Sequence, residues 1–214
     1  MMEPMAMEMK AYTGGELMCH GYLVIGEGGE CVAIDAPGGF AAWAVSQLPA
    51  GARLSHLLLT HQHFDHIEDA AALQQATGCT IHACRPYNDE LTLASHAASW
   101  GIPAPAPFHV DDALGTHDST ARWAGLNWAA LHIPGHASDG MVYSLPEAKL
   151  LFAGDVLFEG SIGRTDMPGG SMAQLVRGIR SKIMILPPET RVLPGHGPAT
   201  SVGEEELNNP FIQG

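Results

Sequence analysis

Short apolar runs alternate along the chain with polar segments that contain glycine and proline. Runs such as Leu23-Val24-Ile25 and Leu57-Leu58-Leu59 predict buried strands, since each ends in turn or polar residues. Residues 40–48 are typical of a helix, and residues 172–184 carry apolar side chains at helical spacing. Strands with interleaved helices indicate a layered α/β fold.

The other predicted elements continue this order. Two hairpins are expected, one over residues 17–35 and one over residues 141–152. Further strands are predicted at 79–83, 126–133 and 191–193, and further helices at 67–76 and 87–100. Three prolines in residues 102–108 predict an irregular connector.

The clearest chemical signal is the segment from Thr60 to His66, which directly follows the strand at 57–59. Side chains two apart on an extended segment share a face, so His61 and His63 can point at one metal ion, and Asp65 continues that face. His66 follows where the chain turns into a helix and can reach a second ion. Imidazole and carboxylate groups suit zinc and other first-row metals. Packing alone does not explain this spacing.

Three other apolar strands end in a glycine followed by a metal-binding side chain. These pairs are Gly-His at 135–136, Gly-Asp at 154–155 and Gly-His at 195–196. Glycine lets the backbone turn sharply at a strand end and approach a site closely. The candidate metal ligands are therefore His61, His63, Asp65, His66, His136, Asp155 and His196.

This set, His-x-His-x-Asp-His followed by Pro-Gly-His, Gly-Asp and Gly-His, resembles the metallo-β-lactamase superfamily over almost the whole chain. The resemblance implies a four-layer αββα sandwich with metal ions at one edge between the two sheets. It also implies a first metal position, a second position and a bridge between them. The implied first position consists of His61, His63 and His136, and the implied second position of Asp65, His66 and His196. The implied bridge is Asp155. Two divalent metal ions are the implied cofactors, with zinc expected and iron or manganese as alternatives.

Within the superfamily, residues 160–170 and the ending from Gly195 to Phe211 resemble the short type II glyoxalases, which are hydroxyacylglutathione hydrolases. Met167 departs from the expected phenylalanine. Glu68 stands among residues that are usually small, and we expect it to add a carboxylate near the site entrance. The chain ends before the helical domain that carries glutathione contacts in long glyoxalases, so residues 1–214 are expected to form one metallo-β-lactamase-like domain. Glutathione recognition stays open.

Leaving-group chemistry favours a thioester as the substrate. Two metal ions supply hydroxide at neutral pH, because metal binding lowers the pKa of water to about 7. A thiol has a pKa near 8.5, so a thiolate leaves without obligatory protonation, whereas a lactam nitrogen needs more help. Asp65 is expected to orient the nucleophile as well as bind metal. Arg164 is expected to pair with Asp166, and it is the candidate for substrate contact.

One alternative is a persulfide dioxygenase of the same superfamily. Such enzymes hold one iron with two histidines and an aspartate, and they share a segment like Gly163–Asp166. Lactam hydrolysis and metal binding without catalysis are less favoured. The chain has 10 Lys+Arg against 23 Asp+Glu, a formal charge of −13, which disfavours nucleic acid and anionic membranes as partners.

The cysteines, the first ten residues and the other histidines do not change the predicted fold or function. The four cysteines form no Cys-x-x-Cys pair and are expected to be reduced and mostly buried. Residues 1–10 lack the features of a signal peptide, so a cytoplasmic location is expected. The oligomeric state is not indicated. Structural or surface roles are expected for the other histidines: His20, His56, His82, His96, His109, His117 and His132.

Overall fold

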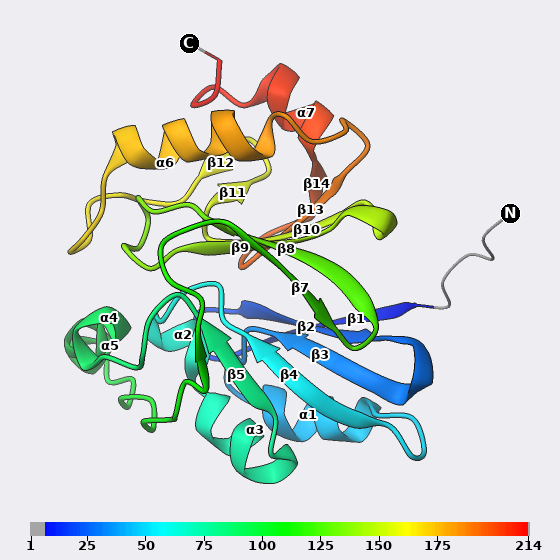
Figure 1. The fold of residues 1–214 in the computed structure, drawn as a ribbon. Helices are drawn as coiled ribbons and strands as arrows, with labels where there is room; N and C mark the ends of the chain where they lie inside the picture. Colours follow the sequence, from blue (N-terminus) through cyan, green and yellow to red (C-terminus); the bar gives the residue numbers. More distant parts are fainter. Residues whose placement is uncertain (1–6, 214) are drawn as a thin grey trace, which may run out of the picture.

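Two six-stranded sheets lie face to face in the computed structural model, which describes residues 7–213 (Figure 1). Most of the methionine-rich start, residues 1–6, lies outside the described residues. In spatial order the first sheet contains β1 (Glu8–Gly14), β2 (Cys19–Ile25), β3 (Glu30–Ile34), β4 (Arg53–Leu58), β5 (Thr80–Ala83) and β6 (Asp112–Ala113). The second contains β14 (Thr200–Ser201), β13 (Arg191–Pro194), β10 (Leu150–Gly154), β9 (Met141–Leu145), β8 (Leu126–His132) and β7 (Ser119–Trp123).

Helices cover the outer face of each sheet. The helices α1 (Phe40–Gln47) and α3 (Ala70–Thr77) pack on the first sheet, and α6 (Met172–Gly178) packs on the second, as Figure 1 shows. Successive side chains of a strand point to opposite faces, so Leu57 packs under the helices while Leu58 packs between the sheets. The four-layer αββα sandwich expected from the sequence is confirmed.

The core between the sheets is rich in aromatic side chains. Trp128, Tyr143 and Phe152 of the second sheet are fully buried there, against Tyr22 and Ile34 of the first. The Tyr143 hydroxyl donates to the Leu59 carbonyl at 2.9 Å, which ties the two sheets together just before the histidine segment.

Two predicted helices are interrupted in the structure. The segment predicted at 67–76 forms α2 (Phe64–Ile67) and then α3, which ends at Gly78 in the left-handed conformation. The segment predicted at 87–100 forms α4 (Asp89–Thr92) and α5 (Ala94–Ser99), because Leu93 is left-handed with φ 55°. The Thr92 hydroxyl accepts from Ala94 N and so replaces helical hydrogen bonding at this break.

The strands missed by sequence analysis lie mainly at sheet edges. No residue of β1 is buried, and β7 alternates between exposed and partly buried positions up to its last residue, the buried Trp123. An edge strand with polar residues on both faces has no apolar run to reveal it. The short strands β11 (Leu157–Phe158) and β12 (Ser161–Ile162) and the helix α7 (Val202–Asn208) were likewise not predicted.

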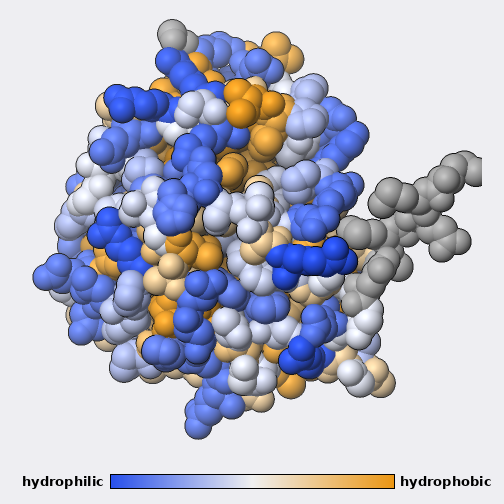
Figure 2. All heavy atoms as spheres, in the orientation of Figure 1, coloured by the Kyte–Doolittle hydropathy of each residue, from blue (hydrophilic) through white to orange (hydrophobic). Residues whose placement is uncertain are grey.

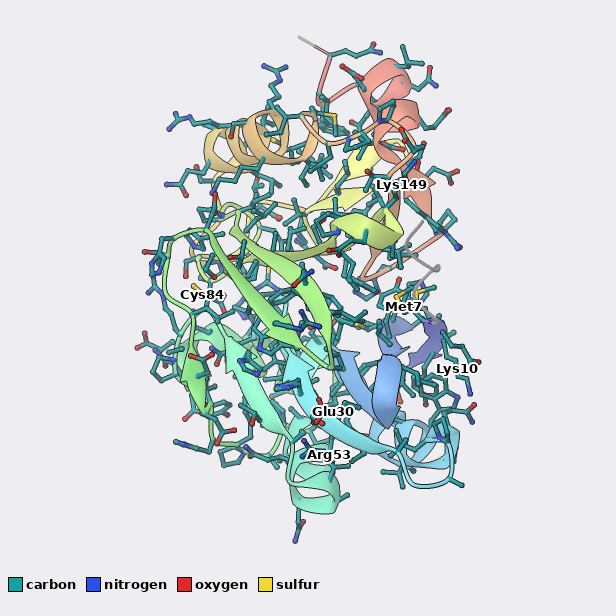
Figure 3. All side chains as sticks on the ribbon, turned by 45° about the vertical axis from the view of Figure 1, so that its right-hand side comes forward. Met7, Lys10, Glu30, Arg53, Cys84 and Lys149 are labelled. Carbon is teal, nitrogen blue, oxygen red and sulfur yellow. The ribbon has the colours of Figure 1, made fainter. Side chains whose placement is uncertain are left out.

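Parallel pairing gathers the candidate ligands at one edge of the sandwich. β3 pairs parallel with β4, and β10 pairs parallel with β13, so the carboxyl ends of these strands point the same way within each sheet. His61 follows β4, Asp155 follows β10 and His196 follows β13. At the amino ends of β3 and β4, Glu30 and Arg53 form a surface ion pair (Figure 3).

The surface is mainly hydrophilic on the face seen in Figure 2, where hydrophobic residues form small separate patches. Among residues 7–213, no helix combines the length and the apolar character needed to cross a bilayer. The four cysteines are buried and free, as expected from their spacing.

Candidate metal centre

The first group of candidate ligands contains His61, His63 and His136. Their ligand nitrogens all lie within 4.8 Å of one another, and all three side chains are buried. His136 Nε2 lies 3.0 Å from His63 Nδ1. Nitrogens that share a tetrahedral zinc ion are about 3.3 Å apart, given Zn–N bonds of about 2.0–2.1 Å. The spacing of the first group therefore suits one metal ion.

The second group contains Asp65, His66 and His196. An oxygen of Asp65 lies 3.1 Å from His196 Nε2 and 3.8 Å from His66 Nε2. Asp65 and His66 stand on α2, whereas His196 comes from the loop after β13. The fold therefore brings together residues from the two sheets.

Asp155 lies between the two groups. One of its oxygens is 3.3 Å from His66 Nε2, and the other is 3.5 Å from His136 Nε2 and 3.8 Å from His196 Nε2. The carboxylate of Asp155 is therefore close to histidines of both groups. This position is compatible with the bridging role that the sequence predicts.

Several buried polar atoms of the centre make no hydrogen bond to any of the described residues. These atoms are His61 Nε2, His66 Nε2 and Asp155 Oδ1. A buried polar group without a hydrogen bond costs free energy, unless water or an ion satisfies it. The orphaned atoms point to a cation, because imidazole and carboxylate lone pairs are metal donors. The residues present therefore fit the metal ions that the sequence predicts.

Burial and neighbouring charges shift the pKa values of these groups in the metal-free chain. Burial, together with the neighbouring histidines, lowers the pKa of His61 well below its usual range and that of His63 to about 3. Burial opposes the charge on Asp155, but His66 and His136 outweigh it and hold its pKa low. His61 and His63 are therefore neutral and ready to bind a cation.

His66 differs from the first group. Burial lowers its pKa, but the carboxylates of Asp155, Asp35 and Asp65 outweigh burial and raise the pKa well above its ordinary value. Metal binding at the second group must therefore displace a proton.

Hydrogen-bond partners at the Nδ1 atoms orient two of the histidine rings. His66 Nδ1 lies 2.8 Å from an oxygen of Asp35, and His136 Nδ1 lies 2.9 Å from the carbonyl oxygen of Arg164. Such partners fix the ring so that its other nitrogen faces the metal. Sequence analysis missed both roles. The available signal for Asp35 was an acidic residue directly after a buried strand, without the glycine that marked Asp155.

The loop after β13 passes very close to the centre at Gly195. A Cβ atom at this position would lie 2.5 Å from a ring carbon of His66 and would also collide with Asp155. Only glycine therefore allows the backbone that carries His196 to approach the two side chains.

The remaining sequence expectations have definite places in the structure. The Arg164 guanidinium forms two 2.8 Å hydrogen bonds to Asp166, so the expected internal pair is confirmed. The sequence predicts that Glu68 adds a carboxylate at the entrance. In the structure this carboxylate accepts from Gly38 N at 2.8 Å and so supports the loop before α1.

Two of the other histidines form a separate polar chain. His56 Nδ1 lies 3.0 Å from His82 Nε2, and His82 Nδ1 lies 2.9 Å from Asp112. Both rings lie near Trp123 between the sheets. This arrangement agrees with the structural role expected for them.

Comparison with known proteins agrees with this geometry. The family model of the metallo-beta-lactamase superfamily matches residues 14–196. The chain is 35% identical to hydroxyacylglutathione hydrolase GloC of Haemophilus influenzae over 183 residues, which cover 84% of this chain and 86% of that protein. The chain belongs to the metallo-β-lactamase superfamily.

Two solved structures extend the comparison. The BLEG-1 B3 metallo-beta-lactamase has a TM-score of 0.87 at 30% identity, covering 97% of this chain and 100% of the other. A di-iron-bound form of TTHA1623 has a TM-score of 0.80 at 34% identity, covering 94% and 99%. Superfamily members bind metal ions, and these relatives together support a metallohydrolase.

Proposed function

We propose that this protein hydrolyses a thioester of the S-lactoylglutathione type with the help of two divalent metal ions, which we expect to be zinc. The observation that carries the proposal is the position of Asp155, whose carboxylate lies within 3.3–3.8 Å of histidines from both candidate ligand groups. One carboxylate between two sets of imidazoles suits a pair of metal ions better than a single one.

The metal ions, when bound, would activate a water molecule at neutral pH and polarise the substrate carbonyl. His61, His63 and His136 would hold the first ion, and Asp65, His66 and His196 the second. The Asp65 oxygen that lies 3.1 Å from His196 Nε2 could also accept a hydrogen bond that orients the attacking water.

The leaving group decides between acyl substrates. The two carboxylates of the centre, Asp65 and Asp155, are both assigned as ligands, so neither is left to protonate a leaving group. A thiolate leaves without a proton because the pKa of a thiol is about 8.5. A thioester is therefore the acyl substrate that this centre serves best.

The similarity to the hydroxyacylglutathione hydrolase of Haemophilus influenzae supports glutathione as the thiol part of the substrate. Arg164 is a candidate for contact with this part, because its guanidinium is more than half exposed beside Asp166. We also propose that the partner is a small molecule and that nucleic acid and membranes are not ligands. The charge of −13 supports this. We also propose a cytoplasmic location for the protein.

Two other activities have specific support. The likeness to BLEG-1 favours β-lactam hydrolysis, and the segment Gly163–Asp166 favours a persulfide dioxygenase with one iron. The test compares three reactions of one metal-loaded preparation. These are hydrolysis of S-lactoylglutathione, hydrolysis of a chromogenic cephalosporin and oxygen uptake with glutathione persulfide.

The proposal expects thioester turnover with kcat/KM at least about 10²-fold above that for the cephalosporin, and no oxygen uptake. A preference for the cephalosporin, or oxygen uptake without thioester hydrolysis, would overturn it. A chelated preparation, and the same preparation after metal is restored, serve as controls for metal dependence.

A further inference from the structure

Cys19 lies next to the second group of candidate ligands, which contains Asp65, His66 and His196. It begins β2, and the next residue ties this strand to the loop that carries His196. His20 N donates to Gly195 O at 2.7 Å, and the His20 ring lies 2.8 Å from Gly197 O. The start of β2 is therefore fixed against this loop.

The Cys19 thiol lies within ligand distance of the second group. Its sulfur and one ligand atom each of Asp65, His66 and His196 all lie within 4.8 Å of one another. Ligand atoms around a tetrahedral zinc ion are about 3.3–3.8 Å apart, given Zn–N of about 2.0–2.1 Å and Zn–S of about 2.3 Å. A small contraction would bring all four atoms onto one ion.

The thiol has no other strong partner among the described residues. Cys19 is fully buried, and its hydrogen-bond contact is a weak one to the neighbouring His20 carbonyl at 3.7 Å. His66 is also fully buried. Asp35 holds its Nδ1 atom, and its Nε2 atom, which faces the same group, makes no hydrogen bond to the described residues. Two independent side chains thus converge on one point.

We propose that Cys19 is a further, thiolate ligand of the second metal position and makes this position selective for zinc over manganese. Thiolate is a soft ligand that favours zinc, whereas manganese prefers oxygen ligands. The first group contains only imidazoles, so the two positions would differ in metal preference. The inference rests on metal binding by the second group, which is part of the proposed function, and does not depend on the substrate.

Cobalt substitution tests the assignment directly. A Co²⁺ ion bound by a thiolate has a sulfur-to-metal charge-transfer band in the near ultraviolet, and imidazole or carboxylate ligands do not give it. The metal-free full chain is titrated with Co²⁺, and absorbance is followed for the wild type, Cys19→Ser, Cys19→Ala and Cys79→Ser. Cys79 is the matched control, because it is buried under the outer helices in a core cluster that does not contain Cys19.

The inference expects the band in the wild type and in Cys79→Ser, and its loss in both Cys19 variants. It also expects the Cys19 variants to bind the second zinc ion at least about tenfold more weakly, with a smaller preference for zinc over manganese. The wild-type spectrum tests the inference even where a variant folds poorly.

Two cobalt ions per chain without the band would overturn the role of Cys19 and leave the binuclear proposal standing. A single cobalt ion without the band would overturn both. An unchanged band in a folded Cys19 variant would also overturn the inference.

Discussion

His66 Nδ1 lies 2.8 Å from a carboxylate oxygen of Asp35, and both side chains are buried. The same carboxylate accepts two hydrogen bonds of 2.7 Å, from the backbone N–H and the hydroxyl of Thr60. Asp35 therefore joins the end of β3 to the start of the histidine segment and holds the His66 ring with Nε2 facing the metal centre. Asp35 has a left-handed backbone, with φ 56°.

Replacing Asp35 by asparagine tests this orienting role. Asparagine tolerates the left-handed backbone, so the fold should persist, but the negative charge behind His66 is lost. We expect the affinity for the second metal ion to fall by about 10- to 100-fold, measured by competition with a chelator. Asp118→Asn, which changes a partly exposed carboxylate that pairs with Lys182, is the matched control. Equal affinities in the two variants would contradict the role.

Asp155→Ala tests the bridge between the groups. Because its oxygens face both groups, we expect the loss of this side chain to weaken both metal positions and not only one. After gel filtration, atomic emission should measure less metal per chain in the variant than in the wild type, whether one or two equivalents of metal were added. Full loading with two ions would count against a bridging position.

Asp65→Asn separates orientation of the nucleophile from metal binding. We expect turnover to fall by about 10²- to 10⁴-fold in a variant loaded with the same metal content as the wild type. Thermal unfolding should show that the fold persists. Equal turnover at equal metal content would exclude a role of Asp65 beyond that of a ligand.

Asp139 provides a test by pH. Its carboxylate is buried and accepts from Gln62 N at 3.1 Å, and burial raises its pKa from 3.8 to about 6. Between these two values the folded chain binds more protons than the unfolded chain, so the free energy of unfolding falls as pH rises. The loss is complete above about pH 6 and amounts to about 3 kcal/mol at most.

Urea unfolding of the metal-free wild type and of Asp139→Asn, at several values between pH 4 and pH 8, measures this effect. The asparagine still offers an acceptor to Gln62 N but does not titrate. We expect the variant to gain stability relative to the wild type as pH rises through the window from about 4 to about 6. A stability difference that is constant across this window would show that Asp139 does not titrate there.

Most of the sandwich could be predicted because its inner strands are apolar and end in turn residues. Leu57 and Leu58 pack on opposite faces of one sheet, so their strand is apolar throughout. The edge strand β1 has no fully buried residue, and nothing in its pattern distinguishes it from a loop. The break at Leu93 depends on hydrogen bonds of the Thr92 side chain that propensity does not reveal.

The seven side chains predicted as ligands could be found because each follows a predicted strand and belongs to a metal-binding residue type. The structure brings all seven together, and their role as ligands stays a prediction. Asp35, the Arg164 carbonyl and Cys19 were not found, because their positions depend on contacts between distant segments. Cys19 in particular belongs to no motif in the sequence, and it comes close to Asp65, His66 and His196 only in the folded chain.

The most direct test of the binuclear thioester hydrolase is a titration of the metal-free chain with zinc, followed by the rate of S-lactoylglutathione hydrolysis at each step. We predict that two zinc ions bind per chain and that hydrolysis reaches its full rate only as the second equivalent is completed. Binding of one metal ion without hydrolysis, together with iron-dependent oxygen uptake on glutathione persulfide, would contradict the account and identify a dioxygenase.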